Sequence, residues 1–395
     1  MSKHIKTRLA QAGRQYAEHG IVNPPVYSAS TVTFDSVAAL ERATKNPFEG
    51  VYYGRHGTPT VFAFEEAVAE LDGGYYRAVA TSSGLAAITI TLLAYLKPGD
   101  ELLMVDSVYG PTRGFCDTVL ADMGVTTHYY DPDVGEGISA LIKPNTRLIF
   151  MESPGSLSFE VQDVAAIAAA AKAHGVMTAI DNTWATPLFF RPFEHGVDLV
   201  IHAATKYLVG HADAMLGLIT VADETAFKTI KTMAVRLGNC PGPDACALGL
   251  RGLRTLSARL VQHQQHALTV AEWLQQRDEV AEVMYPALPG SKGHALWQRD
   301  FDGASGLLGV VLTTRNATAL AAMLDGLEHF GLGYSWGGYE SLALPTRGGI
   351  QRSVTGCPQT ETLRLHIGLE SPADLIADLE AGFARLKAVD DTTAN

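Results

Sequence analysis

Short apolar runs alternate with longer stretches of helical length through the middle of the chain. Seven runs have the length and composition of buried strands; they are Ala78–Thr81, Leu102–Val105, Thr126–Tyr130, Arg147–Met151, Val176–Ile180, Leu199–His202 and Met215–Val221. The stretches between them include Leu85–Leu96, Pro111–Met123 and Val164–His174. This alternation predicts βαβ units and a mainly parallel sheet. We expect the seventh strand to be antiparallel, because it follows the sixth after only a loop and a parallel return needs a crossover of about a dozen residues.

The regions on either side of this pattern differ from it. Residues 1–58 are rich in Pro, Tyr, Ser and Gly, and NPPVYSAS and GVYYGRHGT predict an irregular arm. Thr58 and Pro59 suit the N-cap and first position of a helix that reaches about Leu71. After a long helical pattern from about Arg251, the chain mixes expected strands and helices at Gly309–Thr313, Ala317–Leu324, Arg364–Leu369 and Pro372–Leu386. The prediction is an arm (1–58), a large domain (59–250) and a smaller α+β C-terminal domain (251–395).

Charge and cysteine usage narrow the partners and the compartment. Thirty basic and 42 acidic residues give a net charge of −12, so no electrostatic footprint of a nucleic-acid-binding protein is present. The four cysteines show no CxxC spacing, and the charged N-terminus lacks a secretory signal, which favours the cytoplasm. The uncharged segment Ala78–Leu96 approaches membrane-spanning length, but TSSG interrupts it. We therefore expect neither a nucleic-acid nor a membrane partner.

Residues with chemical potential follow four of the predicted strands. Ligands of open α/β sheets bind beyond the carboxyl ends of the strands, where this chain has Thr81-Ser82-Ser83-Gly84, Tyr109, Asp181 and Lys206. Singly, these could be a helix cap, a packing ring, a second cap and a solvated lysine. Together they supply a phosphate cradle, an aromatic ring, a carboxylate and an amine. Pyridoxal phosphate requires this set of groups.

Five spaced motifs carry a resemblance to a known family. SSGLAA, VYG, ESPGS, DNTWATP and HAATKYLVGHAD are similar to those of the Cys/Met-metabolism group of pyridoxal-phosphate enzymes, over nearly the whole chain. The resemblance implies an α/β protein of fold-type I, the PLP-dependent transferase-like fold. It has a mainly parallel seven-stranded sheet with one antiparallel strand and a smaller α+β C-terminal domain. It also implies pyridoxal 5'-phosphate as the cofactor and no metal.

The resemblance assigns roles residue by residue. Lys206 forms the Schiff base with the cofactor, Asp181 pairs with the pyridinium nitrogen, and Tyr109 stacks on the ring. The phosphate-binding residues are Ser83, Gly84, Leu85 and Thr205, with Tyr53 and Arg55 reaching in from a neighbouring subunit. Tyr53 is also counted with the catalytic residues. A site shared between subunits requires at least a dimer, and the resemblance implies a homotetramer built from two such dimers. The family often has Ser three residues before the lysine, where this chain has Ala203. One side-chain hydroxyl that would bind the phosphate is therefore expected to be missing.

Two further segments concern the substrate. GYSWGGYESL and RLHIGLE resemble members that act at Cβ; γ-acting members typically show SLGG where this chain has SWGG, and ESPTNP where it has ESPGSL. Arg364 is assigned to the substrate α-carboxylate, and Tyr334, Ser335 and Trp336 to the substrate pocket. The expected substrate is a thioether amino acid such as L-cystathionine, cleaved to L-homocysteine, pyruvate and ammonia.

Several alternatives stay open at this point. A γ-acting lyase or synthase, or a β-lyase of cysteine conjugates, would share the cofactor residues. A cofactor-binding carrier and a nicotinamide-dependent dehydrogenase are less favoured, the latter because GxGxxG is missing after the first strand. The possible metal ligands His202, His211, Asp213, His263 and His266 are better explained as core or surface residues. Arg347 and Arg352 are expected to be solvated.

Overall fold

The strands of the large sheet match the seven apolar runs. In the computed structural model, which describes residues 3–73 and 76–393, the sheet has the order β1-β7-β6-β5-β4-β2-β3. Its strands are β1 (Arg77–Thr81), β2 (Glu101–Val105), β3 (Thr126–Tyr130), β4 (Thr146–Glu152), β5 (Met177–Asp181), β6 (Leu199–His202) and β7 (Gly217–Val221). β7 is antiparallel to both β1 and β6, whereas the pairs from β6 to β3 are parallel. The predicted sheet, including its antiparallel strand, is confirmed.

Helices cover this sheet, which explains the continuous apolar character of its central strands. Every residue of β2, β6 and β7 is buried, as expected for strands covered on both faces. The helices of this part are α3 (Pro59–Leu71), α4 (Gly84–Tyr95), α5 (Gly110–Phe115), α6 (Val164–Ala173), α7 (Thr186–Phe189) and α8 (Glu224–Arg236). α5 continues as a π-helical turn, η3 (Cys116–Leu120), and the 3-10 turns are η4 (Gly135–Leu141) and η5 (Pro192–His195). Segment 78–96 is divided between β1 and α4, and no helix of the described residues is long and apolar enough to cross a membrane.

A second, five-stranded sheet lies in the C-terminal part, with the order β10-β11-β12-β9-β8. Its strands are β8 (Val280–Met284), β9 (Leu307–Leu312), β10 (Gly331–Leu332), β11 (Leu342–Pro345) and β12 (Thr362–His366). The helical elements are α10 (His294–Asp300), α11 (Ala317–Asp325), the 3-10 turn η6 (Arg347–Gly349) and α12 (Pro372–Thr393). The expected β9, β12, α11 and α12 are present. β8, β10 and β11 were missed because they are short and lack a clear apolar run.

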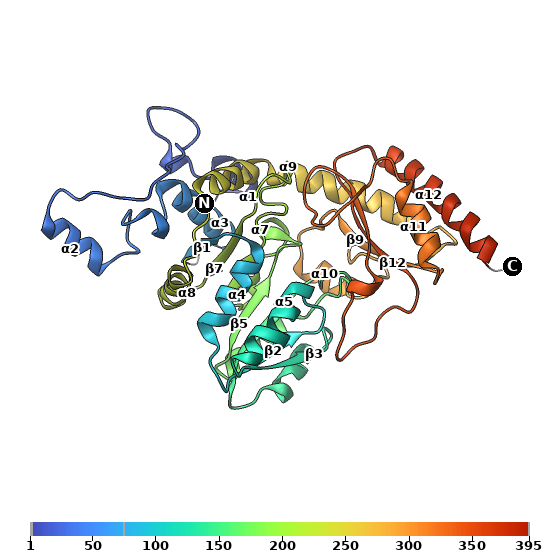
Figure 1. Cartoon of the computed structure of the whole chain (residues 1–395), viewed down its shortest axis with the longest axis horizontal. Coiled ribbons are helices and arrows are strands. Elements are labelled where there is room, and N and C mark those ends of the chain that lie inside the picture. The colour runs from blue at the N-terminus through green and yellow to red at the C-terminus, as the bar shows by residue number, and fades with distance from the viewer. Residues whose placement is uncertain (1–2, 74–75, 394–395) are drawn as a thin grey trace.

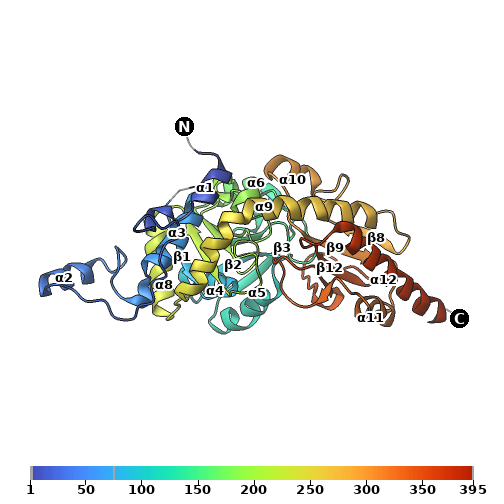
Figure 2. The same cartoon turned by 90° about the horizontal axis from the view of Figure 1, so that it is seen from above.

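One long helix connects the two sheets. α9 (Pro243–Leu274) packs against α1 and α3 at its beginning and against β8, β9 and α12 at its end. Figures 1 and 2 both show it running from the region around the large sheet to the smaller domain. The domain division expected at 250/251 therefore falls inside a continuous helix. A rigid element of 32 residues thus couples the two parts.

The N-terminal arm contains more helix than its composition indicates. α1 (Ile5–Gln11) buries Leu9, and α2 (Val37–Lys45) begins at Ser36, whose side chain accepts a hydrogen bond from the Ala39 N–H. Two 3-10 turns, η1 (Arg14–Tyr16) and η2 (Gly54–His56), lie on either side of α2. The segments NPPVYSAS and GVYYGRHGT are otherwise irregular, as expected. α2 has no buried residue and extends away from the rest of the chain (Figure 1).

Candidate active site

The turn between β1 and α4 places the N-terminal end of a helix at the edge of the sheet. Ser83 is the N-cap of α4, and its hydroxyl accepts a hydrogen bond from the Ala86 N–H at 3.1 Å. Gly84 and Leu85 occupy the first turn, where helix N–H groups have no intrahelical acceptor. The helix dipole adds a partial positive charge at the same place. This turn suits a phosphate group.

The segment before Lys206 packs directly against this turn. A Cβ atom at Gly84 would lie 2.4 Å from Cβ of Ala203, so the close approach of the two segments requires glycine at 84. Thr205 lies nearby, but its hydroxyl already donates to the Leu216 carbonyl at 3.1 Å and accepts from the Leu216 N–H at 2.8 Å. The hydroxyl of Thr205 can contact a phosphate only by giving up one of these bonds.

Asp181 ends β5 and is buried close to Lys206. Its carboxylate accepts hydrogen bonds from the N–H and the hydroxyl of Thr183, and the same hydroxyl accepts from the Ala203 N–H. Burial raises the pKa of Asp181, against the lowering effects of Thr183 and of the charges on His202 and Lys206. A carboxylate in this position is stabilised by a cationic partner.

Lys206 follows β6 and reaches toward the loop that precedes β11. Its Nζ donates to the Ser335 hydroxyl at 2.6 Å and lies 5.2 Å from the centre of the Trp336 ring. Burial, with a contribution from the Arg364 charge, lowers the pKa of Lys206 to about 8, although Asp181 opposes this. The neutral, nucleophilic form of this amine is therefore far more populated near neutral pH than in an ordinary lysine, whose pKa is 10.5.

Ser335 joins Lys206 to Arg364. While its hydroxyl accepts from Lys206, its carbonyl oxygen accepts from the Arg364 guanidinium at 2.7 Å. Ser335 has φ of 73°, a left-handed conformation that is uncommon for a residue other than glycine. Burial lowers the pKa of Arg364 to about 10, partly offset by the phenols of Tyr109, Tyr207 and Tyr334. The loop thus places an amine and a guanidinium on either side of one serine.

Tyr109 is the N-cap residue of α5, beyond the end of β2. Its N–H donates to the half-buried Glu152 carboxylate at 2.8 Å, and Tyr109 is 43% exposed. Burial raises the pKa of the Tyr109 phenol, with the carboxylates of Glu152 and Asp181 adding to the effect and Arg364 opposing it. The phenol hydroxyl therefore keeps its proton, and it lies close enough to Asp181 and Arg364 for their charges to affect its pKa.

A buried histidine holds the loop of Ser335 and Trp336. Nε2 of His366 accepts the Gly337 N–H at 3.1 Å, and Nδ1 lies 2.9 Å from the Glu340 carbonyl oxygen, which fixes a neutral tautomer that donates from Nδ1. Burial keeps the pKa of His366 well below its ordinary value. Gly337 has φ of 88°, and a Cβ there would lie 2.9 Å from the Lys206 carbonyl carbon. Trp336 packs its ring 5.5 Å from that of Tyr207, so it has a packing role as well as facing Lys206.

Not all the predicted residues are brought together within one chain. The residues that meet around one sheet edge are Ser83, Gly84, Leu85, Tyr109, Asp181, Thr205, Lys206, Ser335, Trp336 and Arg364. Tyr334 is 87% exposed and Tyr53 is 41% exposed. Arg55 donates to the Val235 carbonyl oxygen at 2.7 Å. Within the described part of the chain, Tyr53 and Arg55 make none of the site contacts given above.

Several residues around the site were missed although they lie inside the recognised motifs. Glu152 belongs to ESPGS, Thr183 to DNTWATP and His366 to RLHIGLE. Thr183 and His366 each lie two residues from an assigned position, Asp181 and Arg364, and that proximity was their only signal. Glu152 has no assigned residue near it in the chain, and only its place in a recognised motif could have indicated it. Arg352 was expected to be solvated, but this was wrong: its side chain is 3% exposed and contacts Glu160 at 3.3 Å. Arg347, at 45% exposure, pairs with Glu361 at 2.6 Å.

The histidines considered as metal ligands have other partners. His202 contacts Asp72 at 3.0 Å, and Nδ1 of His263 lies 2.8 Å from the Ile367 carbonyl oxygen. Nδ1 of His211 lies 2.8 Å from the Val209 carbonyl oxygen, and Nδ1 of His266 lies 3.2 Å from that of Gly368. In the described part of the chain, no three His, Cys, Asp or Glu residues are grouped as metal ligands would be.

The donor set fits pyridoxal phosphate. The helix N-terminus at Ser83 to Leu85 suits the phosphate, the buried Asp181 suits a protonated pyridine nitrogen, and the Lys206 amine suits the aldehyde. Tyr109 supplies an aromatic ring on the same edge. The protein therefore offers one group for each recognition element of this cofactor.

Comparisons with known proteins agree with this fit. Residues 6–384 match the family model described as Cys/Met metabolism PLP-dependent enzyme. The chain is 44% identical to a cystathionine beta-lyase of Salmonella typhimurium, over 97% of this chain and 99% of the relative, and 44% identical to that of Escherichia coli with the same coverage. A solved cystathionine gamma synthase of Xanthomonas oryzae in complex with cystathionine superposes with a TM-score of 0.90 at 32% identity, covering 98% of this chain and 100% of the other.

Proposed function

The chain belongs to the Cys/Met-metabolism family of pyridoxal-phosphate-dependent enzymes, and we propose that it is a carbon–sulfur β-lyase that cleaves L-cystathionine. The observation that carries the proposal is the loop in which Ser335 bonds both Lys206 and Arg364 while Trp336 faces Lys206. This loop includes the SWGG segment that distinguishes the chain from the γ-acting pattern. Two relatives at 44% identity are named as cystathionine beta-lyases, which supports the same substrate.

The proposed roles follow from the positions of the side chains. Arg364 binds the substrate α-carboxylate, since a guanidinium matches a carboxylate with two parallel hydrogen bonds. Its link to Ser335 places that carboxylate near the Lys206 amine. The neutral amine of Lys206, favoured by its lowered pKa, removes the proton from Cα. Pyridoxal phosphate, when bound, supplies the electron sink that accepts the electron pair of the broken C–H bond.

The remaining residues hold the reacting groups in place. The Asp181 carboxylate would stabilise the positive charge of a protonated pyridine nitrogen in this buried position. Tyr109, protonated because its pKa is raised, covers the ring, and Ser83, Gly84, Leu85 and Thr205 bind the phosphate. The bond from Cβ to sulfur then breaks, with the electron pair leaving on sulfur. In sum, L-cystathionine and water give L-homocysteine, pyruvate and ammonia.

The identity of the 2-oxo acid tests this proposal. We expect the purified, cofactor-loaded protein to release pyruvate and homocysteine from L-cystathionine, as identified by mass spectrometry. Pyruvate requires cleavage at Cβ. Release of 2-oxobutyrate instead would contradict the proposal, because that product arises from cleavage at Cγ by the alternative γ-acting reaction. Cysteine conjugates assayed in parallel reveal whether a broader β-lyase activity exceeds that on cystathionine.

We also propose a cytoplasmic homotetramer in which neighbouring subunits complete each site. Tyr53 and Arg55 would reach the neighbour's phosphate site, in keeping with their position outside their own chain's site. The arm exposes apolar side chains, among them Val22 at 62% and Val37 at 72%, which is typical of a surface that another chain covers. The four cysteines are unpaired, which suits a reducing compartment.

The oligomer is expected to persist under assay conditions. Light scattering coupled to size exclusion should give a mass of at least two chains, because each active site would need residues from a second chain, and of about four chains if two such dimers associate as the family resemblance implies. A fully active monomer of 42.2 kDa would contradict the shared site.

A further inference from the structure

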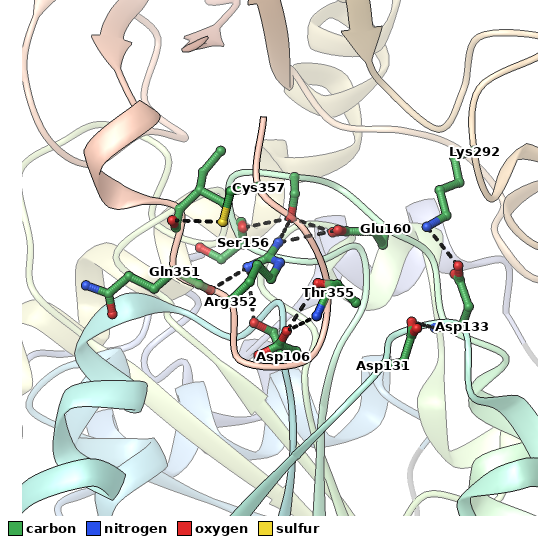
Figure 3. Close-up of polar contacts among 12 residues, drawn as sticks. Asp106, Asp131, Asp133, Ser156, Glu160, Lys292, Gln351, Arg352, Thr355 and Cys357 are labelled. Atoms are coloured by element: carbon green, nitrogen blue, oxygen red, sulfur yellow. Dashed lines mark hydrogen bonds and ion pairs between the residues drawn. The ribbon is translucent and has the colours of Figure 1, made fainter. Parts of the chain in front are cut away.

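A completely buried carboxylate joins the two domains close to the site. Asp106 follows β2, three residues before Tyr109, and is 0% exposed. Its carboxylate accepts hydrogen bonds from the N–H groups of Ser353, Val354 and Thr355 at 2.8, 2.9 and 2.9 Å. The Thr355 hydroxyl adds a fourth bond at 3.1 Å. Figure 3 shows the segment of Thr355 folded over Asp106.

The same carboxylate organises the turn that carries Tyr109. Arg113, on α5, donates to the Asp106 carboxylate and to the Asp106 carbonyl oxygen, both at 2.8 Å. The second terminal nitrogen of the Arg113 guanidinium, Nη1, donates to the Ser353 hydroxyl at 2.9 Å. Because the turn from Asp106 to Arg113 contains Tyr109, one ion pair holds both the aromatic residue and the loop of the other domain.

Arg352 also contributes to this junction. It donates to the Asp106 carbonyl oxygen at 3.1 Å and to the Ser158 hydroxyl, and it pairs with Glu160 (Figure 3). Burial alone would raise the pKa of Asp106, but the N–H groups of Thr355, Ser353 and Val354 and the Arg113 guanidinium together lower it to about 2. The carboxylate is therefore ionised throughout the neutral pH range.

The loop held by Asp106 connects the two strands that position the substrate arginine. β11 and β12 are antiparallel, with Leu344 opposite Arg364, and residues 346–361 link them. β11 is preceded by the loop whose Ser335 bonds Arg364. An anchor on this connection limits the movement of β11 and β12 relative to β2, and hence of Arg364 relative to Tyr109.

We propose that Asp106 is a positioning residue that sets Arg364 against the cofactor side of the site by clasping residues 353–355. The proposal deepens the proposed function, because it rests on Arg364 binding the substrate carboxylate. Asp106 touches neither the substrate nor the reacting atoms. Its effect should therefore appear in the binding of amino-acid carboxylates and depend on Arg364.

The test compares Asp106→Asn with the wild type as cofactor-loaded protein. The ligand is L-alanine, which carries the carboxylate but no sulfur to eliminate; its Kd is measured from the change in visible absorption of the bound cofactor. Asparagine keeps the size but turns an NH2 group toward N–H donors, so we expect the Kd for L-alanine and the KM for L-cystathionine to rise about tenfold. kcat should fall less than the affinity. Amide hydrogen exchange at 353–355 should become faster.

Asp133→Asn is the matched control. Asp133 pairs with Lys292 of the smaller domain at 2.7 Å, also seen in Figure 3, but both side chains are at least half exposed. An exposed pair contributes little, and this one does not hold the 346–361 connection. We expect its Kd and KM to stay at wild-type values. If Asp106→Asn behaved like this control, the proposal would be wrong.

The Asp106→Asn substitution in the Arg364→Lys variant distinguishes positioning of Arg364 from a general loss of structure. In Arg364→Lys, whose affinity is already reduced, adding Asp106→Asn should weaken L-alanine binding by much less than tenfold, because the group that Asp106 positions has lost its fork geometry. An undiminished effect in this background would overturn the proposal. If Asp106→Asn does not fold, Thr355→Val, which removes only the hydroxyl bond, should raise the Kd about threefold; an unchanged Kd would overturn it equally.

The measurement with L-alanine allows the two proposals to be tested separately. A wild-type protein that binds L-alanine through Arg364 but does not release pyruvate from cystathionine would refute the proposed function and still allow the role of Asp106 to be decided. A wild type that cleaves cystathionine while Asp106→Asn is unaffected would refute only the role of Asp106.

Discussion

Replacing Lys206 by alanine should lower the turnover of L-cystathionine by about 10⁴-fold or more. In the proposed function the amine has two roles, covalent bonding to the cofactor and removal of the Cα proton, and each role alone would contribute about 10² to 10⁴-fold. The structure equips Lys206 for both: burial lowers its pKa to about 8 and Ser335 orients its Nζ. Pyruvate release at saturating substrate measures the effect. A variant that kept substantial turnover would exclude Lys206 as the catalytic amine.

The same amine gives the wild type a characteristic pH dependence. Only the neutral amine attacks an aldehyde, so capture of pyridoxal phosphate by cofactor-free protein should accelerate as pH rises and level off above the Lys206 pKa of about 8. An ordinary lysine, with its pKa of 10.5, would still gain rate well above that pH. Stopped-flow absorbance at a series of pH values gives the midpoint.

Lys206→Arg is the matched control for the loss of charge. It keeps a cation near Trp336 and Ser335 but has no amine that can bond to the aldehyde. We expect it to be as inactive as Lys206→Ala. Its unfolding temperature should be closer to that of the wild type than the unfolding temperature of Lys206→Ala is. Activity in the arginine variant would mean that the positive charge, not the amine, is required.

Asp181→Asn should reduce turnover by about 10² to 10³-fold, the size typical of losing one key electrostatic contact in a buried site. The asparagine retains an oxygen for the Thr183 hydrogen bonds but no charge to stabilise a protonated pyridine nitrogen. The electron sink then weakens. kcat should carry most of the loss, because a protonated pyridine nitrogen would be needed to accept the electron pair from Cα but contributes little to binding the substrate.

Asp198→Asn provides a control with the same local pattern. The Asp198 carboxylate accepts from the N–H and the hydroxyl of Thr178 at 2.9 and 2.7 Å, as Asp181 does from Thr183, but it lies at the opposite edge of the sheet, just before β6. The change should affect stability alone. An equal loss of kcat in both variants would show that Asp181 has only a structural role.

Local information accounts for much of the fold and for the positions of the candidate chemistry. The apolar runs predicted all seven strands of the large sheet, because strands covered on both faces must be apolar throughout. Tyr109, Asp181 and Lys206 were identified because each follows such a strand. α2 was missed since it has no buried residue, and β8 since only its last two residues are buried and it shows no comparable apolar run.

The contacts between distant segments could not be predicted in this way. Arg352 was expected to be solvated, yet it is buried between residues that lie nearly 200 positions or more away in the chain. Ser335 was assigned to a pocket, but its left-handed backbone and its bonds to Lys206 and Arg364 depend on how the smaller domain closes over the larger one. Nothing in a local pattern specifies such a pairing.

By itself, then, the sequence determined the seven strands of the large sheet and the helices between them, the edge of that sheet where the candidate ligand groups gather, and the amine, the carboxylate and the turn proposed to bind the cofactor. Periodicity and residue type are local properties, and they suffice for these. Only the tertiary structure decided that Ser335 bridges Lys206 and Arg364, that His366 is held neutral beneath Gly337, and that Asp106 clasps residues 353–355. The burial that shifts each pKa and the partners that satisfy each buried charge come from segments far apart in the chain.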